Sequence, residues 1–158
     1  MTLLEVIVAL PLLSIMLLSL GTAFLLLLRM YFCDLGDGEL QEQLRLAAVN
    51  IVTDVSYADR VEVQQDGLKI WSRRRSSGQG WINYRLKDPL SVGKITKNTQ
   101  PLTGDSIHGD IRITKLHCSK MNERTLLLEI EGINKTTGKI FSIETAAFLQ
   151  NAVMAADS

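Results

Sequence analysis

Apolar residues follow one another almost without interruption near the start of the chain. From Val6 to Leu28 no residue carries a formal charge. As a helix rising ~1.5 Å per residue, this segment extends roughly 34 Å, enough to cross a hydrocarbon core of about 30 Å. A secretory signal peptide begins with basic residues and has an apolar stretch of only about 7–15 residues. A buried core helix normally keeps a polar face. The pattern therefore predicts a membrane-spanning helix.

Beyond Arg29 the apolar residues take on a helical period, at i, i+4, i+7, i+11 and i+15. The residues of this stripe are Leu40, Leu44, Ala47, Ile51 and Val55. Residues 30–60 are therefore predicted to form an amphipathic stem helix that packs on a sheet. The triplet Gly36-Asp37-Gly38 weakens that helix, since each internal glycine costs about 1 kcal/mol relative to alanine. We expect a break or flexible joint there.

From residue 61 onward the period changes to two, which is typical of strands. The expected strands are 61–63, 68–71, 81–86, 111–116, 125–130 and 139–145. Residues 88–110, which contain Pro89 and Pro101, form the least ordered stretch by composition. The predicted fold class is α+β, a long N-terminal helix packed on an antiparallel sheet. Its parts are a transmembrane helix (1–29), a stem helix (30–60) and a β head (61–158).

Charge gives no reason to expect a nucleic-acid partner, because 17 basic and 17 acidic residues leave a formal net charge of zero. The run Arg73-Arg74-Arg75 lies beside an expected turn. It is either a solvated turn or a contact for anionic headgroups or phosphate. Trp71 and Trp81 flank the run and are expected to pack on the strands rather than to form a ligand platform. No specific nucleic-acid site is expected.

No arrangement of residues indicates catalysis. His108 and His117 are the only histidines, and neither has an acid or thiol at a familiar catalytic or metal-binding spacing. No nucleophile with an adjacent base is found, so neither enzyme activity nor a cofactor is expected.

Two groups of acids are candidates for calcium binding, although neither matches an EF-hand loop, and no metal site is predicted. One group is Asp105 and Asp110, and the other is Asp34, Asp37 and Glu39.

The two cysteines, Cys33 and Cys118, leave two alternatives open. They form a disulfide if the head lies outside the cytoplasm and the geometry permits, or they stay free thiols.

Glu5 is the only ionisable side chain before Arg29. A carboxylate in the middle of a bilayer costs about 2.5–3.5 kcal/mol on insertion scales, so this position requires an explanation. One explanation places Glu5 at the membrane edge, close to the positive end of the helix. The other is a cation from a second molecule, for which the α-amino group of an identical or related helix is the nearest type.

The segment Thr2-Leu3-Leu4-Glu5-Val6-Ile7-Val8-Ala9-Leu10 closely resembles the mature N-terminus of the type IV pilin superfamily, with its class III prepilin-type N-terminus. The resemblance implies that a prepilin peptidase removes a short basic leader and methylates the new N-terminus at Met1. It also implies that Glu5 pairs with the α-amino group of an adjacent subunit during filament assembly. Met1 departs from the usual phenylalanine, and an initiator methionine in place of a leader is the alternative.

A removed basic leader also settles the expected orientation. Arg29 alone would place the C-terminal part in the cytoplasm under the positive-inside rule. With a leader, the N-terminus lies at the cytoplasmic face of the inner membrane and the head lies outside.

Pro11 and Gly21 interrupt the predicted span. Proline removes a backbone donor and glycine permits local unwinding, so both are candidates for a kink or for melting once helices pack together. The alternative is that such residues are simply common in membrane helices.

The C-terminal segment Ala146-Ala147-Phe148-Leu149-Gln150-Asn151 resembles the closing strand of J-type minor pseudopilins of type II secretion and of W-type minor pilins. The order helix, meander, long loop and final hairpin is similar as well. The resemblance implies a minor, priming or tip subunit of a type IV pilus, a secretion pseudopilus or a competence filament. Its partners would be other pilin or pseudopilin subunits, the prepilin peptidase, an inner-membrane assembly platform and, before assembly, membrane lipid. A major pilin and a membrane-tethered ligand-binding module remain the alternatives.

Overall fold

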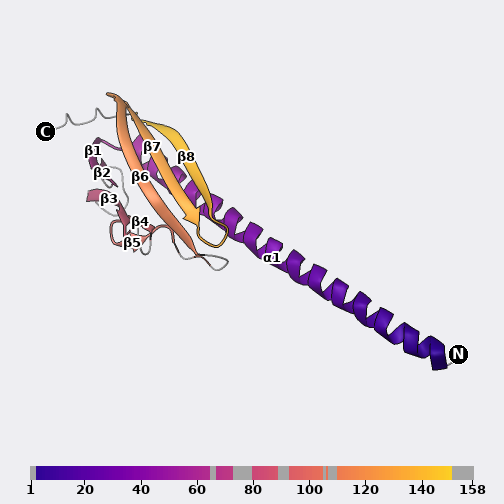
Figure 1. Ribbon diagram of the computed structural model, residues 1–158. Coiled ribbons are helices and arrows are strands. Elements are labelled where there is room, and N and C mark those ends of the chain that lie inside the picture. Colours follow the sequence, from indigo (N-terminus) through magenta and orange to yellow (C-terminus); the bar gives the residue numbers. More distant parts are fainter. Residues whose placement is uncertain are drawn as a thin grey trace.

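One long helix dominates the structure. The computed structural model describes residues 3–64, 67–72, 80–88, 93–104, 106 and 110–150. Helix α1 (Leu3–Ser56) has 54 residues and therefore extends ~80 Å. Its first half projects away from the head, whereas its second half lies against the strands (Figure 1). The predicted membrane helix and stem helix are thus two halves of one continuous element.

The break expected at Gly36-Asp37-Gly38 is wrong, because α1 runs through the triplet without interruption. Gly36 and Asp37 are buried against the head while Gly38 is exposed. Most helical stability in proteins comes from tertiary packing rather than from propensity. Here packing and the polar contacts of Asp37 offset the cost of the two glycines.

Five strands follow α1 and form an antiparallel meander in chain order. They are β1 (Arg60–Gln64), β2 (Gly67–Ser72), β3 (Gly80–Lys87), β4 (Lys94–Lys97) and β5 (Gln100–Pro101). The first three confirm the expected strands, whereas β4 and β5 lie in the segment expected to be least ordered. A tight turn at Asn98 explains the difference, since Asn98 has a positive φ of 59°, which asparagine tolerates. Its amide N donates to the Asn83 carbonyl at 2.7 Å, which fixes the turn to β3.

The last three strands form a second antiparallel sheet in the order β6-β7-β8. They are β6 (Ile111–Asn122), β7 (Thr125–Asn134) and β8 (Lys139–Phe148). All three were expected and all are longer than predicted. The head therefore contains two sheets rather than one. Ala146, Ala147 and Phe148 belong to β8, the last described strand, and Leu149 and Gln150 follow it.

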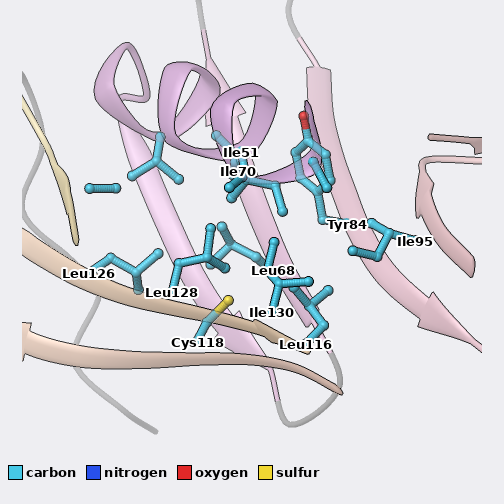
Figure 2. Packing of buried hydrophobic residues seen from close by; sticks show 14 of the residues in the cluster. Ile51, Leu68, Ile70, Tyr84, Ile95, Leu116, Cys118, Leu126, Leu128 and Ile130 are labelled. Atoms are coloured by element: carbon cyan, nitrogen blue, oxygen red, sulfur yellow. The ribbon is translucent and has the colours of Figure 1, made fainter. Parts of the chain in front are cut away.

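The core lies between α1 and both sheets, and the predicted helical stripe is confirmed as its helical side. Figure 2 shows Ile51 of α1 beside Ile70, with Tyr84, Leu128 and Ile130 around them. The buried stripe residues are Leu40, Leu44, Ala47, Ile51 and Val55, all 0% exposed. Gly132 of β7 allows α1 to pack closely on this strand, because a Cβ placed there would lie 2.8 Å from Leu40 Cδ1.

The end of α1 is tied to the five-stranded sheet by a polar cluster. The Tyr84 hydroxyl of β3 donates to Asp54 Oδ2 at 2.7 Å. Lys97 of β4 forms an ion pair with the same carboxylate and lies 5.5 Å from the centre of the Tyr84 ring. Because Tyr84 is fully buried, its hydroxyl requires such an acceptor.

Candidate functional site: the exposed N-terminal helix

The first half of α1 presents apolar side chains in every direction. The large apolar residues described between Val6 and Phe32 are 36–73% exposed, and the head covers none of them. By length and composition this helix is able to cross a membrane. An exposed apolar surface of this extent marks a site of membrane or protein contact. The segment is therefore suited to a surrounding of lipid or of other protein.

Glu5 lies in the first turn of α1 and its side chain is exposed. The N-terminal turn carries the positive end of the helix dipole, which favours a carboxylate there. Met1, the expected site of processing and methylation, and Thr2 lie outside the described residues. Pairing of Glu5 with the α-amino group of another chain is a contact between molecules, and it stays a prediction.

Pro11 and Gly21 both lie within regular α-helix. Proline has no amide hydrogen to donate, so the usual bond to the Ile7 carbonyl is missing. One turn later, Ser14 Oγ donates to the Leu10 carbonyl at 2.9 Å. A Cβ added at Gly21 would meet no atom within 4 Å. Local unwinding of the helix at these positions is expected only once several helices pack together, so it also stays a prediction.

The transition from exposed helix to head is marked by a buried carboxylate, Asp37, which is 5% exposed. Asn134 Nδ2 and Thr137 Oγ1 donate to its Oδ1 at 2.8 and 2.7 Å. Lys139 Nζ lies 2.7 Å from its Oδ2. Desolvation by burial acts to raise the pKa of Asp37, but hydrogen bonds from Lys139, Thr137 and Asn134, together with the charge of Lys139, lower it overall. The carboxylate therefore stays charged while locking α1 to the β7–β8 turn.

Two further polar contacts hold the stem to the segment after β5. The amide N of Gly104 donates to Gln43 Oε1 at 2.9 Å. Ser106 Oγ donates to Glu39 Oε2 at 2.9 Å. Together with Asp37, these contacts fix the direction in which the exposed helix leaves the head.

The structural role of Asp37 was not predicted from the sequence, although its position carries a signal. Asp37 lies three residues before Leu40 and seven before Leu44, which places it on the apolar stripe. A charge on a buried stripe requires partners.

The structure gives no support for a disulfide between Cys33 and Cys118, since both are free thiols. Cys118 is opposite Leu128, whereas Cys33 lies one turn before Asp37, which contacts Asn134. Leu128 and Asn134 are six residues apart on β7, or about 20 Å at ~3.3 Å per residue. A disulfide requires Cα atoms within about 7 Å.

The remaining candidates that the structure describes do not come together in a site. His117 is exposed on β6 opposite Glu129, and Trp71 and Trp81 are register partners on β2 and β3. His108, Asp105 and the run Arg73-Arg74-Arg75 lie outside the described residues.

Three of the acids considered for calcium binding have other contacts. Asp110 Oδ1 accepts from Arg112 Nε at 3.1 Å, while Asp37 and Glu39 contact different parts of the head. Among the residues that the structure describes, no group of three or more His, Cys, Asp or Glu side chains has the spacing of a metal site.

Comparisons with known proteins return no family model, no curated protein and no solved structure that matches the chain. Functional inference therefore rests on the residues and their geometry.

Proposed function

We propose that this chain is a non-enzymatic, pilin-like subunit that is stored in the membrane and assembles into a filament through its N-terminal helix. The observation that carries the proposal is one carboxylate, Glu5, at the start of an apolar helix that stands clear of the head. A simple tether needs apolar length but does not need this acid. The similarity of residues 2–10 to mature pilin N-termini favours the same role.

Assembly by this helix is an exchange of environments. In lipid, its side chains contact acyl chains, and in a filament they would contact the helices of neighbouring subunits, where packing and polar contacts supply the free energy. Glu5 would pair with the α-amino group of the adjacent subunit, which sets axial register. Misplaced neighbours are disfavoured because a charge in apolar surroundings without a partner is costly.

The contacts of Asp37, Glu39 and Gln43 support this mechanism, because they fix the helix to the head. Packing of helices at the centre of a filament would then also determine where each head lies. We further propose, from the resemblance to J-type pseudopilins and W-type pilins, that the chain is a minor subunit that primes assembly or lies near the tip. Its head would lie outside the cytoplasm, in the periplasm or beyond the cell.

Replacement of Glu5 tests the proposal. Glu5→Gln removes the charge at nearly constant shape, and we expect its recovery in sheared filaments to fall about tenfold, equivalent to ~1.4 kcal/mol per subunit. Glu42→Gln is the matched control, because Glu42 is an exposed carboxylate on the same helix. Normal membrane levels of both variants exclude an expression defect. Equal incorporation of Glu5→Gln and the parent chain would favour the tether instead.

Intact mass of the native protein provides an independent test. A chain that begins at a methylated Met1 supports leader processing by a prepilin peptidase. An unmethylated chain with the mass of an unprocessed start argues against it.

A further inference from the structure

Strand β8 forms an outer edge of its sheet, and among the described strands it pairs only with β7. Proteins usually protect such edges by short strands, bulges, prolines or lysines. β8 has ten residues without a proline, and its register with β7 is continuous from Lys139 to Phe148. Its only lysine, Lys139, lies at one end and pairs with Asp37. The edge is therefore open to pairing with another strand.

The face of this sheet that points away from α1 carries an electrostatic conflict. Glu144 of β8 is directly opposite Glu129 of β7, and like charges in this relation are destabilising. Glu129 has a partner, because Lys115 Nζ of β6 lies 2.7 Å from its Oε1. Within the part of the chain that the structure describes, no cation forms an ion pair with Glu144. A positively charged side chain on a strand paired to the free side of β8 would compensate the charge of Glu144.

Two exposed apolar residues flank Glu144 on the same face. Ile140 and Phe148 lie four residues to either side of it, and alternate residues of a strand share a face. They are 61% and 55% exposed. A strand that paired with β8 would therefore meet an apolar, an acidic and a second apolar residue at regular intervals.

We propose that the β8 edge binds an extended segment of a partner protein that carries a lysine or arginine opposite Glu144 and apolar residues four positions to either side of it. Backbone hydrogen bonds supply general affinity in such strand addition, and side chains at alternate positions supply specificity. The inference concerns the head alone and holds whether or not the chain assembles into filaments.

A second copy of this chain fits the edge poorly. Antiparallel pairing of two β8 strands about Ile143 would place the two Glu144 side chains within two positions of one another, beside both copies of Glu129. The other described strands at sheet edges are β1, β5 and β6. β1 and β5 have five and two residues, and neither reaches from the residue opposite Ile140 to the residue opposite Phe148. β6 has twelve residues, but none of its lysines or arginines has apolar residues four positions to both sides.

The test uses the full-length chain in detergent micelles and labelled nine-residue peptides. One peptide has isoleucine at both ends, lysine at the centre and threonine elsewhere, and its match has glutamate at the centre. We expect the lysine peptide to bind about fivefold more tightly, from the size of cross-strand charge pairs. Glu144→Lys should reverse the order of the two peptides. Glu123→Lys is the control, because Glu123 is exposed in the β6–β7 turn, and it should leave the order unchanged.

Methylation of peptide amides tests whether the backbone pairs. N-methyl groups on the alternate amides that face β8 should abolish binding, whereas methylation of the other set should leave it intact. Equal binding of both methylated peptides, absence of binding by either parent peptide, or an unchanged order in Glu144→Lys would overturn the proposal. Sedimentation of the chain alone checks for a second copy. A dimer that Glu144→Lys strengthens would overturn the proposal in favour of self-pairing.

Discussion

Asp37 of α1 and Asn134 at the end of β7 are 97 positions apart in the chain and are joined by a buried hydrogen bond of 2.8 Å. Asn134 is 1% exposed, and its own Oδ1 accepts from the amide N of Thr136 at 3.0 Å. One side chain of the helix thus organises the β7–β8 turn. This contact lies where the exposed helix enters the head, so it helps to set the direction of the helix relative to the head.

Loss of the Asp37 carboxylate should destabilise the head. Asp37→Ala leaves the buried Asn134 amide without its acceptor, and we expect a decrease of about 2 kcal/mol in the free energy of unfolding. Asp34→Ala is the matched control, because Asp34 lies on the same helix and is exposed. Denaturant unfolding of both variants in detergent micelles gives the comparison. Equal stability of the two variants would show that the contacts of the Asp37 carboxylate do not stabilise the head.

The same carboxylate predicts a pH dependence. Its pKa in the folded chain is below the ordinary value of 3.8, so the folded state favours the charged form. The resulting stabilisation is present above pH ~4 and is lost as the pH falls through the folded pKa. The difference in stability between the parent chain and Asp37→Asn should be constant from pH 7 to 5 and decrease below pH 4. Thermal unfolding across this range checks it, and a difference that grows on acidification would contradict the assignment.

Two glycines predict opposite effects of the same substitution. A methyl group at Gly132 would lie 2.8 Å from Leu40 Cδ1 and 3.1 Å from the Arg112 carbonyl oxygen, so Gly132→Ala should destabilise the head by about 1–3 kcal/mol. A methyl group at Gly38 meets nothing within 4 Å, so Gly38→Ala should stabilise α1 by ~1 kcal/mol. Denaturant unfolding of both variants measures the sign of each change in the free energy of unfolding. A destabilised Gly38→Ala would mean that α1 benefits from flexibility there.

The sequence was most informative where periodicity was strong. Leu40, Leu44, Ala47, Ile51 and Val55 showed the buried face of α1, because a helical period depends only on local spacing. The continuity of the helix through Gly36 and Gly38 was not predictable in this way. It depends on Asn134, Thr137 and Lys139, which reach Asp37 only after the chain has folded back. The division of the head into two sheets likewise depends on long-range pairing that alternation does not specify.

The same limit of prediction from sequence applies to the candidate site, the exposed N-terminal helix. Its length, its apolar composition and the isolated position of Glu5 were evident from the sequence. The partner of Glu5 in an assembled state belongs to a second molecule. Neither the periodicity of the sequence nor the fold of one chain can identify it. The proposed pairing of Glu5 is therefore tested by the recovery of Glu5→Gln in sheared filaments.

The cysteines predict a labelling pattern that separates the two thiols. Cys118 is 5% exposed, and burial raises its pKa to about 12, so almost none of the reactive thiolate is present at neutral pH. Cys33 is only partly buried on α1. We expect a maleimide at pH 7 to attach one label to the native chain and two to the denatured chain. Cys33→Ser should abolish native labelling, and Cys118→Ser should leave it unchanged. Mass spectrometry counts the labels, and a native chain that accepts none until a reductant is added would show that the two cysteines pair after all.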